Sequence, residues 1–152
     1  MDPYATLRLS NQLCFPLYAA SKEVVRTYKP LLDKLDLTYT QYITMMAMWE
    51  HKELNVKELG DILYLDSGTL TPLLKKLESK GYLVRKRSSD DERVVMVTIT
   101  DEGMRLQDKA LSVPRKMASC IQLSPDEART LVRLLHRVLA CTEETQFSVG
   151  SR

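Results

Sequence analysis

The spacing of apolar residues changes from a helical pattern to a strand pattern directly after Gly81. Before Gly81, apolar residues recur every three or four positions, which is typical of amphipathic helices. After it, the segments 82–87 and 93–99 are rich in β-branched and aromatic residues, and the polar stretch 88–91 separates them. This pattern predicts a β-hairpin. Glycine often follows the last residue of a helix because it adopts positive φ without strain, so we expect a helix that ends at Gly81 and leads at once into the hairpin.

Helix-start signals predict six helices around this hairpin. The first helical pattern covers 17–35, with Pro30 as an expected kink, and the helix that starts near 101 is expected to weaken around Pro114. N-cap side chains or capping boxes lie at Thr38 with Gln41, Asn55 with Glu58, Asp66, Thr100, and Ser124 with Glu127. The predicted order is four helices, a hairpin and two helices, without an internal repeat. We therefore expect a mainly α fold in a single domain over 1–152, with short tails at 1–6 and 146–152.

Composition excludes several classes of protein. The 152 residues carry 22 basic and 20 acidic side chains, and a net charge of +2 does not by itself indicate a polyanionic partner. The three cysteines contain no C-x-x-C motif, so neither a disulfide framework nor a zinc site is predicted, and we expect no metal and no cofactor. The apolar stretch 13–20 contains Pro16 and is far shorter than the ~20 residues of a membrane span. We expect a cytoplasmic protein with reduced thiols and no membrane partner.

The basic charge is concentrated in one segment. Residues 67–89 carry six basic side chains and a single acidic one, Glu78. Two short helices joined by 64–66 are typical of a helix-turn-helix, and the basic hairpin after them is placed like a wing. A basic helix face is common on helices that bind nothing, and the added wing is what favours DNA. The candidate DNA-binding residues on the fourth predicted helix, opposite its core stripe of Leu70, Leu73, Leu74 and Leu77, are Ser67, Thr69, Thr71, Pro72, Lys75 and Lys76. Those on the predicted hairpin are Arg85, Arg87 and Arg93.

These residues resemble a known family. The segment 66–78 is similar to the recognition helix of MarR-type winged-helix repressors, and Asp91-x-Arg93 followed by 97–100 is similar to the wing of that family. The resemblance covers about residues 7–145. It implies a winged helix-turn-helix within a MarR-like α-helical dimer that reads pseudo-palindromic double-stranded DNA. The DNA-binding lobe would cover about 55–100 and the dimerisation helices about 7–35 and 101–145. The apolar stripe at 131–139 suits dimer burial, although a monomer core would use it too.

A second resemblance concerns Cys14. A lone cysteine among apolar residues is often inert packing, whereas a reactive thiol needs a helix N-terminus, a cation or specific donors, and Ser10 is placed to cap such a helix. The segment 13–15 is similar to the sensing segment of the organic-hydroperoxide branch of the MarR family, the OhrR-like repressors. That resemblance implies that phenols of Tyr28 and Tyr39, supplied across the dimer, favour the thiolate, with Tyr18 nearby. Pro16 departs from the family pattern and is expected to disturb the geometry around Cys14.

The resemblance implies a repressor that is released from DNA when an organic hydroperoxide oxidises Cys14 to a sulfenic acid, which then condenses with another thiol. Either Cys120 of the other subunit, near the end of the fifth predicted helix, or a low-molecular-weight thiol would resolve it, and Cys141 is expected to be a packing residue. One alternative is a repressor that responds to a small phenolic or drug-like ligand in a pocket between the dimerisation and DNA-binding regions. A thiol peroxidase is a distant third, because His51 and His136 are isolated in the sequence and no catalytic array is evident, so we do not expect an enzyme.

Overall fold

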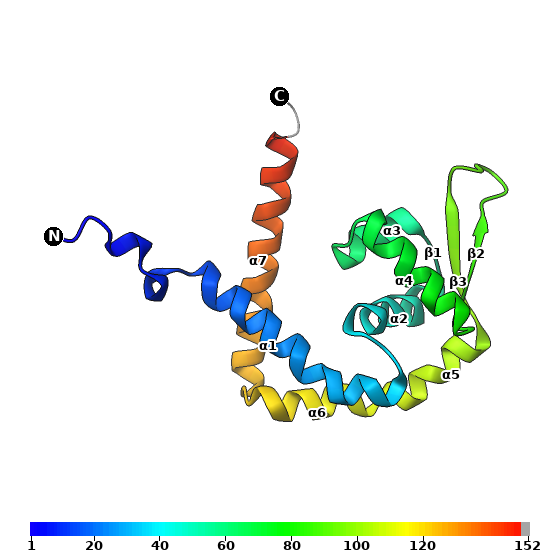
Figure 1. Cartoon of the computed structure of the whole chain (residues 1–152), viewed down its shortest axis with the longest axis horizontal. Coiled ribbons are helices and arrows are strands. Elements are labelled where there is room, and N and C mark those ends of the chain that lie inside the picture. Colours follow the sequence, from blue (N-terminus) through cyan, green and yellow to red (C-terminus); the bar gives the residue numbers. More distant parts are fainter. Residues whose placement is uncertain (150–152) are drawn as a thin grey trace. The chain divides into compact units, whose positions relative to one another are not determined.

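The computed structural model describes the backbone of residues 1–149 and the side chains of 1–143. The chain forms two compact units, Met1–Met117 and Ala118–Arg152. The elements in chain order (Figure 1) are η1 Ala5–Leu7, η2 Leu9–Asn11, α1 Cys14–Leu32, η3 Asp33–Leu35, α2 Tyr39–His51, β1 Glu53–Asn55, α3 Val56–Leu63, α4 Ser67–Ser79, β2 Leu83–Arg87, β3 Val95–Ile99, α5 Asp101–Ala110, α6 Ser112–Ile121 and α7 Pro125–Val149. The predicted fold class, mainly helical with a small β-wing, is confirmed.

The predicted helix caps form. In the capping box before α2, the Gln41 N–H donates to Thr38 Oγ1 (3.2 Å) and the Thr38 N–H donates to Gln41 Oε1 (3.0 Å). Asn55 and Glu58 make the same reciprocal pair before α3. Because each box satisfies backbone donors that have no partner inside the helix, it fixes where the helix begins.

Helix α4 is fixed at both ends. The Asp66 carboxylate accepts the Thr69 N–H (2.7 Å) at its start. At its end, Gly81 has φ +80°, the Gly81 N–H donates to the Glu78 carbonyl (2.9 Å) and the Tyr82 N–H donates to the Leu77 carbonyl (3.1 Å). This is a Schellman motif, in which the glycine takes the left-handed position. The prediction that the helix ends at Gly81 is confirmed.

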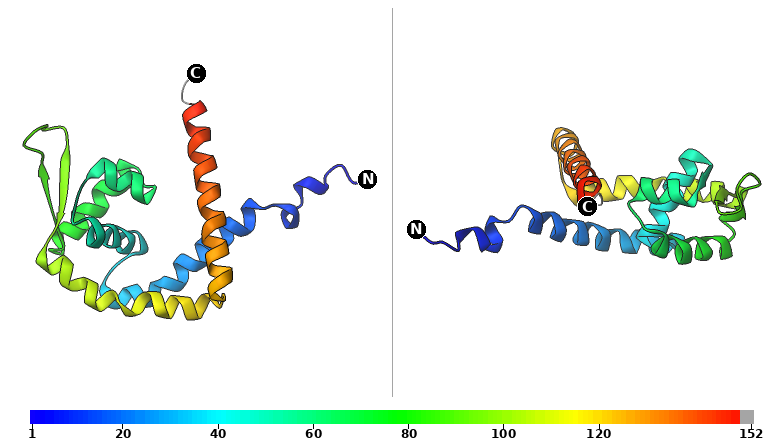
Figure 2. Two further views of the ribbon diagram at one scale, coloured as in Figure 1. Left: turned by 180° about the vertical axis from the view of Figure 1, so that it is seen from behind. Right: turned by 90° about the horizontal axis from the view of Figure 1, so that it is seen from above.

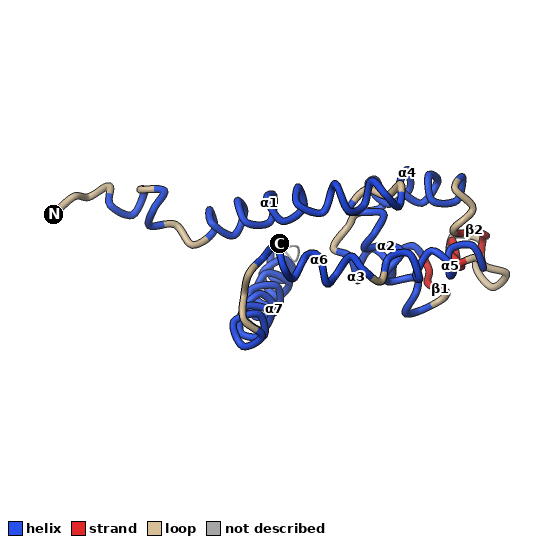
Figure 3. Tube along the Cα trace, turned by 90° about the horizontal axis from the view of Figure 1, so that it is seen from below, coloured by secondary structure: helices blue, strands red, loops and turns tan. Residues whose placement is uncertain are grey.

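The three strands, coloured red in Figure 3, form one antiparallel sheet in the order β1-β3-β2. The hairpin β2–β3 is the predicted wing, and its two strands extend together beyond β1 (Figure 2). Strand β1 was not predicted. Its central residue Leu54 is paired with Val97 of β3, so the hairpin is anchored to the helix-turn-helix by its inner strand.

The core of the first unit is built from α2, α4, the sheet, α5 and the part of α6 up to Met117. All four leucines of the predicted α4 stripe are buried, and so are Met45 and Met48 of α2, Val97 of β3 and Leu106 of α5. Trp49 of α2 lies at the edge of this core, and its indole N–H donates to the Gly103 carbonyl of α5 (2.9 Å). Helix α4 therefore cannot turn about its axis without exposing several leucines.

The helix boundaries differ from the prediction in three places. Helix α1 begins at Cys14 without a side-chain cap, so Ser10, which lies in η2, is not its N-cap. The helix after Thr100 breaks at Leu111, so Cys120 lies on the sixth helix; Pro114 is the third residue of α6, where no N–H donor is needed. Helix α7 continues through residue 149, beyond the expected start of the tail at 146, and 150–152 lie outside the described residues.

Within the second unit, α7 keeps its apolar stripe at the surface. Leu131, Val132, Leu134, Val138 and Leu139 are all exposed. The predicted start of this helix is confirmed: the Ser124 N–H donates to Glu127 Oε2 (2.8 Å), and Pro125 is the first helical residue. Over the part of the chain that the structure describes, no helix combines the length and the apolar character that spanning a membrane requires.

We predict that Gly103→Ala destabilises the fold. A Cβ at Gly103 would lie against the Tyr82 carbonyl oxygen and 2.8 Å from Ile99 Cγ1, and the residue also accepts the Trp49 N–H through its carbonyl. Overpacking of this kind costs about 1–3 kcal/mol of unfolding free energy. Urea denaturation at fixed protein concentration measures it. Gly68→Ala is the matched control, because its nearest neighbour is the movable Asp66 carboxylate at 3.2 Å; equal losses at both glycines would contradict the prediction.

Candidate nucleic-acid interface and thiol site

The exposed face of α4 carries the small and basic side chains that the sequence singled out. Because the four leucines point into the core, the residues between them point to solvent. Ser67 and Thr69 lie in the first turn, and the later turns carry Thr71, Pro72, Lys75 and Lys76; all six are exposed. Small hydroxyls near a helix N-terminus can approach bases or phosphates closely, and the lysines supply positive charge.

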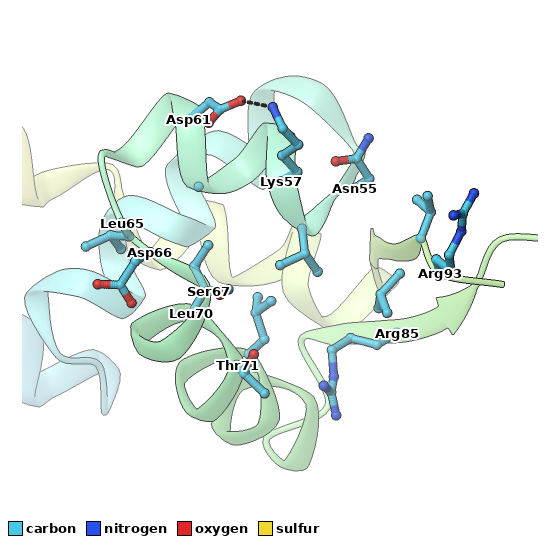
Figure 4. Close-up of a pocket in the computed structure, with 15 residues that line it drawn as sticks. Asn55, Lys57, Asp61, Leu65, Asp66, Ser67, Leu70, Thr71, Arg85 and Arg93 are labelled. Carbon is cyan, nitrogen blue, oxygen red and sulfur yellow. Dashed lines mark hydrogen bonds and ion pairs between the residues drawn. The ribbon is translucent and has the colours of Figure 1, made fainter. Parts of the chain in front are cut away.

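A groove of about 640 Å³ separates α4 from the wing (Figure 4). Ser67 and Thr71 line it from α4, and Arg85 and Arg93 line it from the hairpin. Asn55, Lys57 and Asp61 close its third side from β1 and α3, and Lys57 pairs with Asp61 at 3.1 Å. Sequence reasoning did not single out Lys57, whose helix gave no charge cluster. The groove thus collects four of the predicted DNA-binding residues around one concave surface.

The tip of the wing holds Arg93 at the surface. The Asp91 carboxylate accepts the Arg93 backbone N–H (3.0 Å) and pairs with its guanidinium (3.1 Å), while the Arg93 side chain stays 91% exposed. These contacts lower the pKa of Asp91, mainly through the side-chain hydrogen bond from Arg93. Arg87 donates to the Glu92 carbonyl across the same turn (2.7 Å). Both arginines are therefore oriented before any ligand arrives, and Arg93 stays exposed while its guanidinium is paired with Asp91.

Arg85 differs from the other candidate cations because its ion pair is partly buried, whereas the Arg93 side chain, which pairs with Asp91, stays at the surface. The Arg85 guanidinium contacts the Glu78 carboxylate at 2.9 Å, and both side chains are partly buried. Glu78 is the single acidic residue of the basic segment 67–89. The charge count of the sequence could not show which of the six cations this acid neutralises.

The Cys14 thiol is exposed at the first residue of α1. No side chain caps this helix, so its first N–H groups and the positive end of its dipole lie beside the thiol. Pro16 is the third residue of the helix, a position whose N–H would have no partner inside the helix in any case. The expected disturbance by Pro16 is therefore absent from the hydrogen bonds of α1. Cys120 on α6 and Cys141 on α7 are also exposed in the single chain, although Cys141 was expected to pack.

The structure brings together two of the three tyrosines that were predicted to serve the thiol site. The rings of Tyr28 and Tyr39 lie 4.9 Å apart, and Tyr42, which sequence reasoning missed, lies 5.8 Å from Tyr28. Burial is the main cause that raises the pKa of all three phenols, and the neighbouring phenols add to the effect at Tyr28. Tyr18 lies apart from them on the exposed side of α1, where Lys22 stacks over its ring. Tyr28 and Tyr39 thus remain neutral hydroxyls, which can donate hydrogen bonds, at physiological pH.

Cys14 cannot meet Tyr28 within one chain. Both residues lie on the same continuous helix, α1. Fourteen residues of α-helix at 1.5 Å each separate them by about 21 Å along its axis. A thiol–phenol contact of the kind that the family resemblance implies would need a second copy of the chain.

The fold and the exposed basic surface define a winged helix-turn-helix protein, and comparisons with known proteins agree. The family profile described as "Transcriptional regulator SarA/Rot" matches residues 26–110. The organic hydroperoxide resistance transcriptional regulator of Bacillus subtilis (strain 168) is 47% identical over 133 residues, which cover 88% of this chain and 90% of that protein. The structure of reduced AbfR bound to DNA has a TM-score of 0.75 and 34% identity, covering 90% of this chain and 96% of that one. A disulfide-formed AbfR structure matches with a TM-score of 0.62 and the same identity, covering 88% and 94%.

The chain belongs to the SarA/Rot family of winged-helix transcriptional regulators. The resemblance to MarR-type regulators and to their organic-hydroperoxide branch, inferred from 66–78, the wing and Cys14, is confirmed at the level of the family. Among the described residues, no group of three or more metal-ligating side chains is placed to hold a metal ion.

We predict that part of the tyrosine titration lies above the ordinary pKa of 10.0. Of the seven tyrosines, Tyr28, Tyr39 and Tyr42 should ionise late, and tyrosinate absorbance measures this. Because the folded pKa is raised, the unfolded chain loses these protons first. The contribution of these three tyrosines to stability is therefore fully present below about pH 10 and is lost as the pH rises toward the folded pKa values. Tyr28→Phe/Tyr39→Phe should remove most of the late absorbance; a titration that matches the urea-unfolded protein would contradict the prediction.

Proposed function

We propose that the chain is a dimeric repressor that binds a pseudo-palindromic DNA operator and is released when an organic hydroperoxide oxidises Cys14. The observation that carries the proposal is the exposed Cys14 thiol at the uncapped start of α1, in a chain 47% identical to an organic hydroperoxide resistance regulator. We further propose that the protein is not an enzyme and that it acts in the cytoplasm, where DNA and reduced thiols are both present.

The proposed DNA contacts divide between α4 and the wing. The exposed face of α4, from Ser67 to Lys76, would enter the major groove, because this groove admits a helix and displays the base edges. The extended Arg93 side chain would enter the adjacent minor groove, where the negative potential is strongest. Lys75, Lys76 and Arg87 would neutralise backbone phosphates. A two-fold dimer would present two such surfaces to half-sites about 34–36 Å apart.

The proposed dimer accounts for apolar side chains that a single chain leaves exposed. The stripe on α7 is exposed along at least two turns, and Leu13, Phe15 and Leu17 at the start of α1 are exposed as well. Burial of such side chains in a dimer contributes about 1.5–3 kcal/mol each. The predicted dimerisation helices, about 7–35 and 101–145, contain both sets. The same dimer would bring Tyr28 and Tyr39 of one subunit to Cys14 of the other, where their O–H groups would stabilise the thiolate.

The proposed chemistry consumes one hydroperoxide per thiolate. The thiolate attacks the terminal oxygen of R–O–O–H, the O–O bond breaks, and the products are Cys14 sulfenic acid and the alcohol R–OH once a proton reaches the alkoxide. A second thiol then displaces the sulfenic hydroxyl as water and leaves a disulfide. The second thiol would be Cys120 of the other subunit or a low-molecular-weight thiol. An AbfR described as disulfide-formed, which resembles this chain, supports a disulfide as the oxidised state.

A ligand-responsive repressor is the second candidate. The groove between α4 and the wing has apolar walls from Leu70, Leu74 and Val95 and two arginines at its edge, so a small aromatic acid would fit its chemistry. In that case release from DNA would follow ligand binding and would not depend on Cys14.

We predict a salt-dependent affinity for an operator duplex that weakens in Lys75→Ala and Arg93→Ala. Each lost phosphate contact should lower the slope of log affinity against log salt by about 0.9, so Lys75→Ala should lower it by about 1.8 per dimer. Arg93→Ala should also weaken discrimination of A·T-rich flanks, because Arg93 is proposed to read the minor groove. Fluorescence anisotropy across a salt series measures both. Lys109→Ala, an exposed lysine on α5, is the matched control; a slope that is the same in all four proteins would refute the DNA contacts.

We predict that Cys14→Ser abolishes the response to oxidant and leaves DNA binding intact. After one equivalent of cumene hydroperoxide, the wild-type affinity should fall at least about tenfold, whereas the variant should stay near its reduced value. Cys141→Ser is the matched control and should respond like the wild type. Release of Cys14→Ser by the peroxide at the wild-type dose would overturn the thiol mechanism. Mass spectrometry of the treated wild type then separates a sulfenate, a Cys14–Cys120 disulfide and a mixed disulfide with an added small thiol.

A further inference from the structure

Glu78 and Arg85 make three hydrogen bonds across the junction between the recognition helix and the wing. Arg85 Nε and Nη2 donate to Glu78 Oε2 at 3.2 and 2.9 Å. The backbone N–H of Arg85 donates to Glu78 Oε1 at 3.1 Å. Both carboxylate oxygens of Glu78 therefore accept hydrogen bonds. The side chains of Glu78 and Arg85 are only 35% and 23% exposed, respectively. This double attachment, to side chain and backbone together, restrains the position of strand β2 as well as that of the guanidinium.

The backbone hydrogen bond gives an acceptor to an N–H group at the open edge of the sheet. Strand β2 is an edge strand, because the order is β1-β3-β2. The backbone N–H of Thr100 donates to the Tyr82 carbonyl, and the backbone N–H of Ser88 donates to the Val94 carbonyl. Because hydrogen-bonded pairs alternate along an antiparallel ladder, the even-numbered residues of β2 form the hydrogen-bonded pairs with β3. The N–H of Arg85 consequently points away from β3, toward the open edge. The Glu78 carboxylate supplies the acceptor that no strand provides.

The Glu78–Arg85 contact spans the short link between α4 and β2, which contains Gly81 as a hinge. Helix α4 ends at Ser79 and β2 begins at Leu83, with Gly81 at φ +80° between them. Glu78 lies just before the hinge and Arg85 just after it. A restraint across the hinge fixes the angle at which the hairpin leaves the helix, and that angle decides whether α4 and Arg93 can reach two grooves of one duplex together.

We propose that Glu78 and Arg85 are positioning residues that hold the wing against the recognition helix, and that Arg85 acts on DNA binding through this contact and not as a phosphate ligand. The inference rests on the proposed DNA-binding function and replaces the simpler role that the basic segment predicted for Arg85. The Arg85 contacts also hold the pKa of Glu78 below its usual value, so the carboxylate stays charged at neutral pH.

The two roles of Arg85 predict opposite effects of Glu78→Gln. If Arg85 contacted phosphate, removal of the acid would free the guanidinium and delete a negative charge beside the DNA, so affinity would rise. If the pair positions the wing, the weakened contact would misplace Arg93 and affinity would fall. We expect Glu78→Gln and Arg85→Met each to weaken operator binding about tenfold at constant salt slope, with the double variant no weaker than either single one.

The experiment measures operator affinity across a salt series for the wild type, the two single variants and the double variant. Lys86→Met is the matched control, because it removes the neighbouring positive charge of β2 from an exposed position without touching Glu78. Tighter binding by Glu78→Gln, or a slope that falls by about 1.8 per dimer in Arg85→Met alone, would overturn the proposal.

Amide hydrogen exchange of the DNA-free protein tests the restraint separately. Residues of β2 near Arg85 should exchange about tenfold faster in Glu78→Gln and Arg85→Met than in the wild type or Lys86→Met. Unchanged exchange would overturn the restraint. A wild type that binds no duplex would instead refute the proposed DNA-binding function, and the exchange result would still show whether the pair holds the wing.

Discussion

Burial of one leucine stripe fixes the rotation of α4 and thereby determines which of its side chains face solvent. Leu70, Leu73, Leu74 and Leu77 are each at most 7% exposed. At about 1.5–3 kcal/mol for each buried side chain, they tie the rotation of α4 to the stability of the whole unit. The Asp66 cap and the Gly81 motif then fix its two ends. The exposed face, the groove and the attachment of the wing all depend on this one helix being held in one rotation.

A second constraint comes from the length of α1. Because Cys14 and Tyr28 occupy one helix, the distance between them cannot change without breaking backbone hydrogen bonds. In the proposed mechanism, the phenols and the thiol can therefore meet only between subunits. Dimerisation would then be a condition for sensing as well as for reading two half-sites. Oxidation of the thiol would act directly on the interface that sets the spacing of the two recognition helices.

Local signals in the sequence predicted much of the fold. Some signals depend only on neighbours within five residues and could therefore be recognised in the sequence alone. They are the capping boxes at Thr38 and Asn55, the cap at Asp66 and the glycine at 81. Strand β1 could not be recognised in this way, because its three residues carry no pattern of their own and are extended by pairing with β3, more than forty residues later. The break at Leu111 lies three residues before Pro114, around which the helix was expected to weaken, so the proline indicated the break only approximately.

The candidate site was predictable as a set of residues but not as a set of roles. Charge counting placed six cations in 67–89 and could not distinguish them. Folding gives them different partners: Arg85 pairs with Glu78, and Lys80 pairs with Asp36 at the α1–α2 corner (3.0 Å). Lys75 and Lys76 stay exposed on α4. These pairings depend on contacts across turns and between distant segments, for which a single sequence carries no signal.

The division of the cations into paired and unpaired ones bears on how a chain with a net charge of only +2 can bind a polyanion. A cation that is paired with an acid inside the protein adds little to long-range attraction, because the field of the acid largely cancels its own. Salt screens what remains beyond a Debye length. Such paired cations do stiffen the surface that carries the unpaired ones. A few exposed cations on a rigid surface, which the proposed dimer would present twice, lose less conformational entropy on binding than the same cations on a mobile hairpin would. In the proposed DNA complex, the internal ion pair at the base of the wing would support affinity by preorganisation, while the exposed Lys75 and Lys76 of α4 would supply unpaired charge.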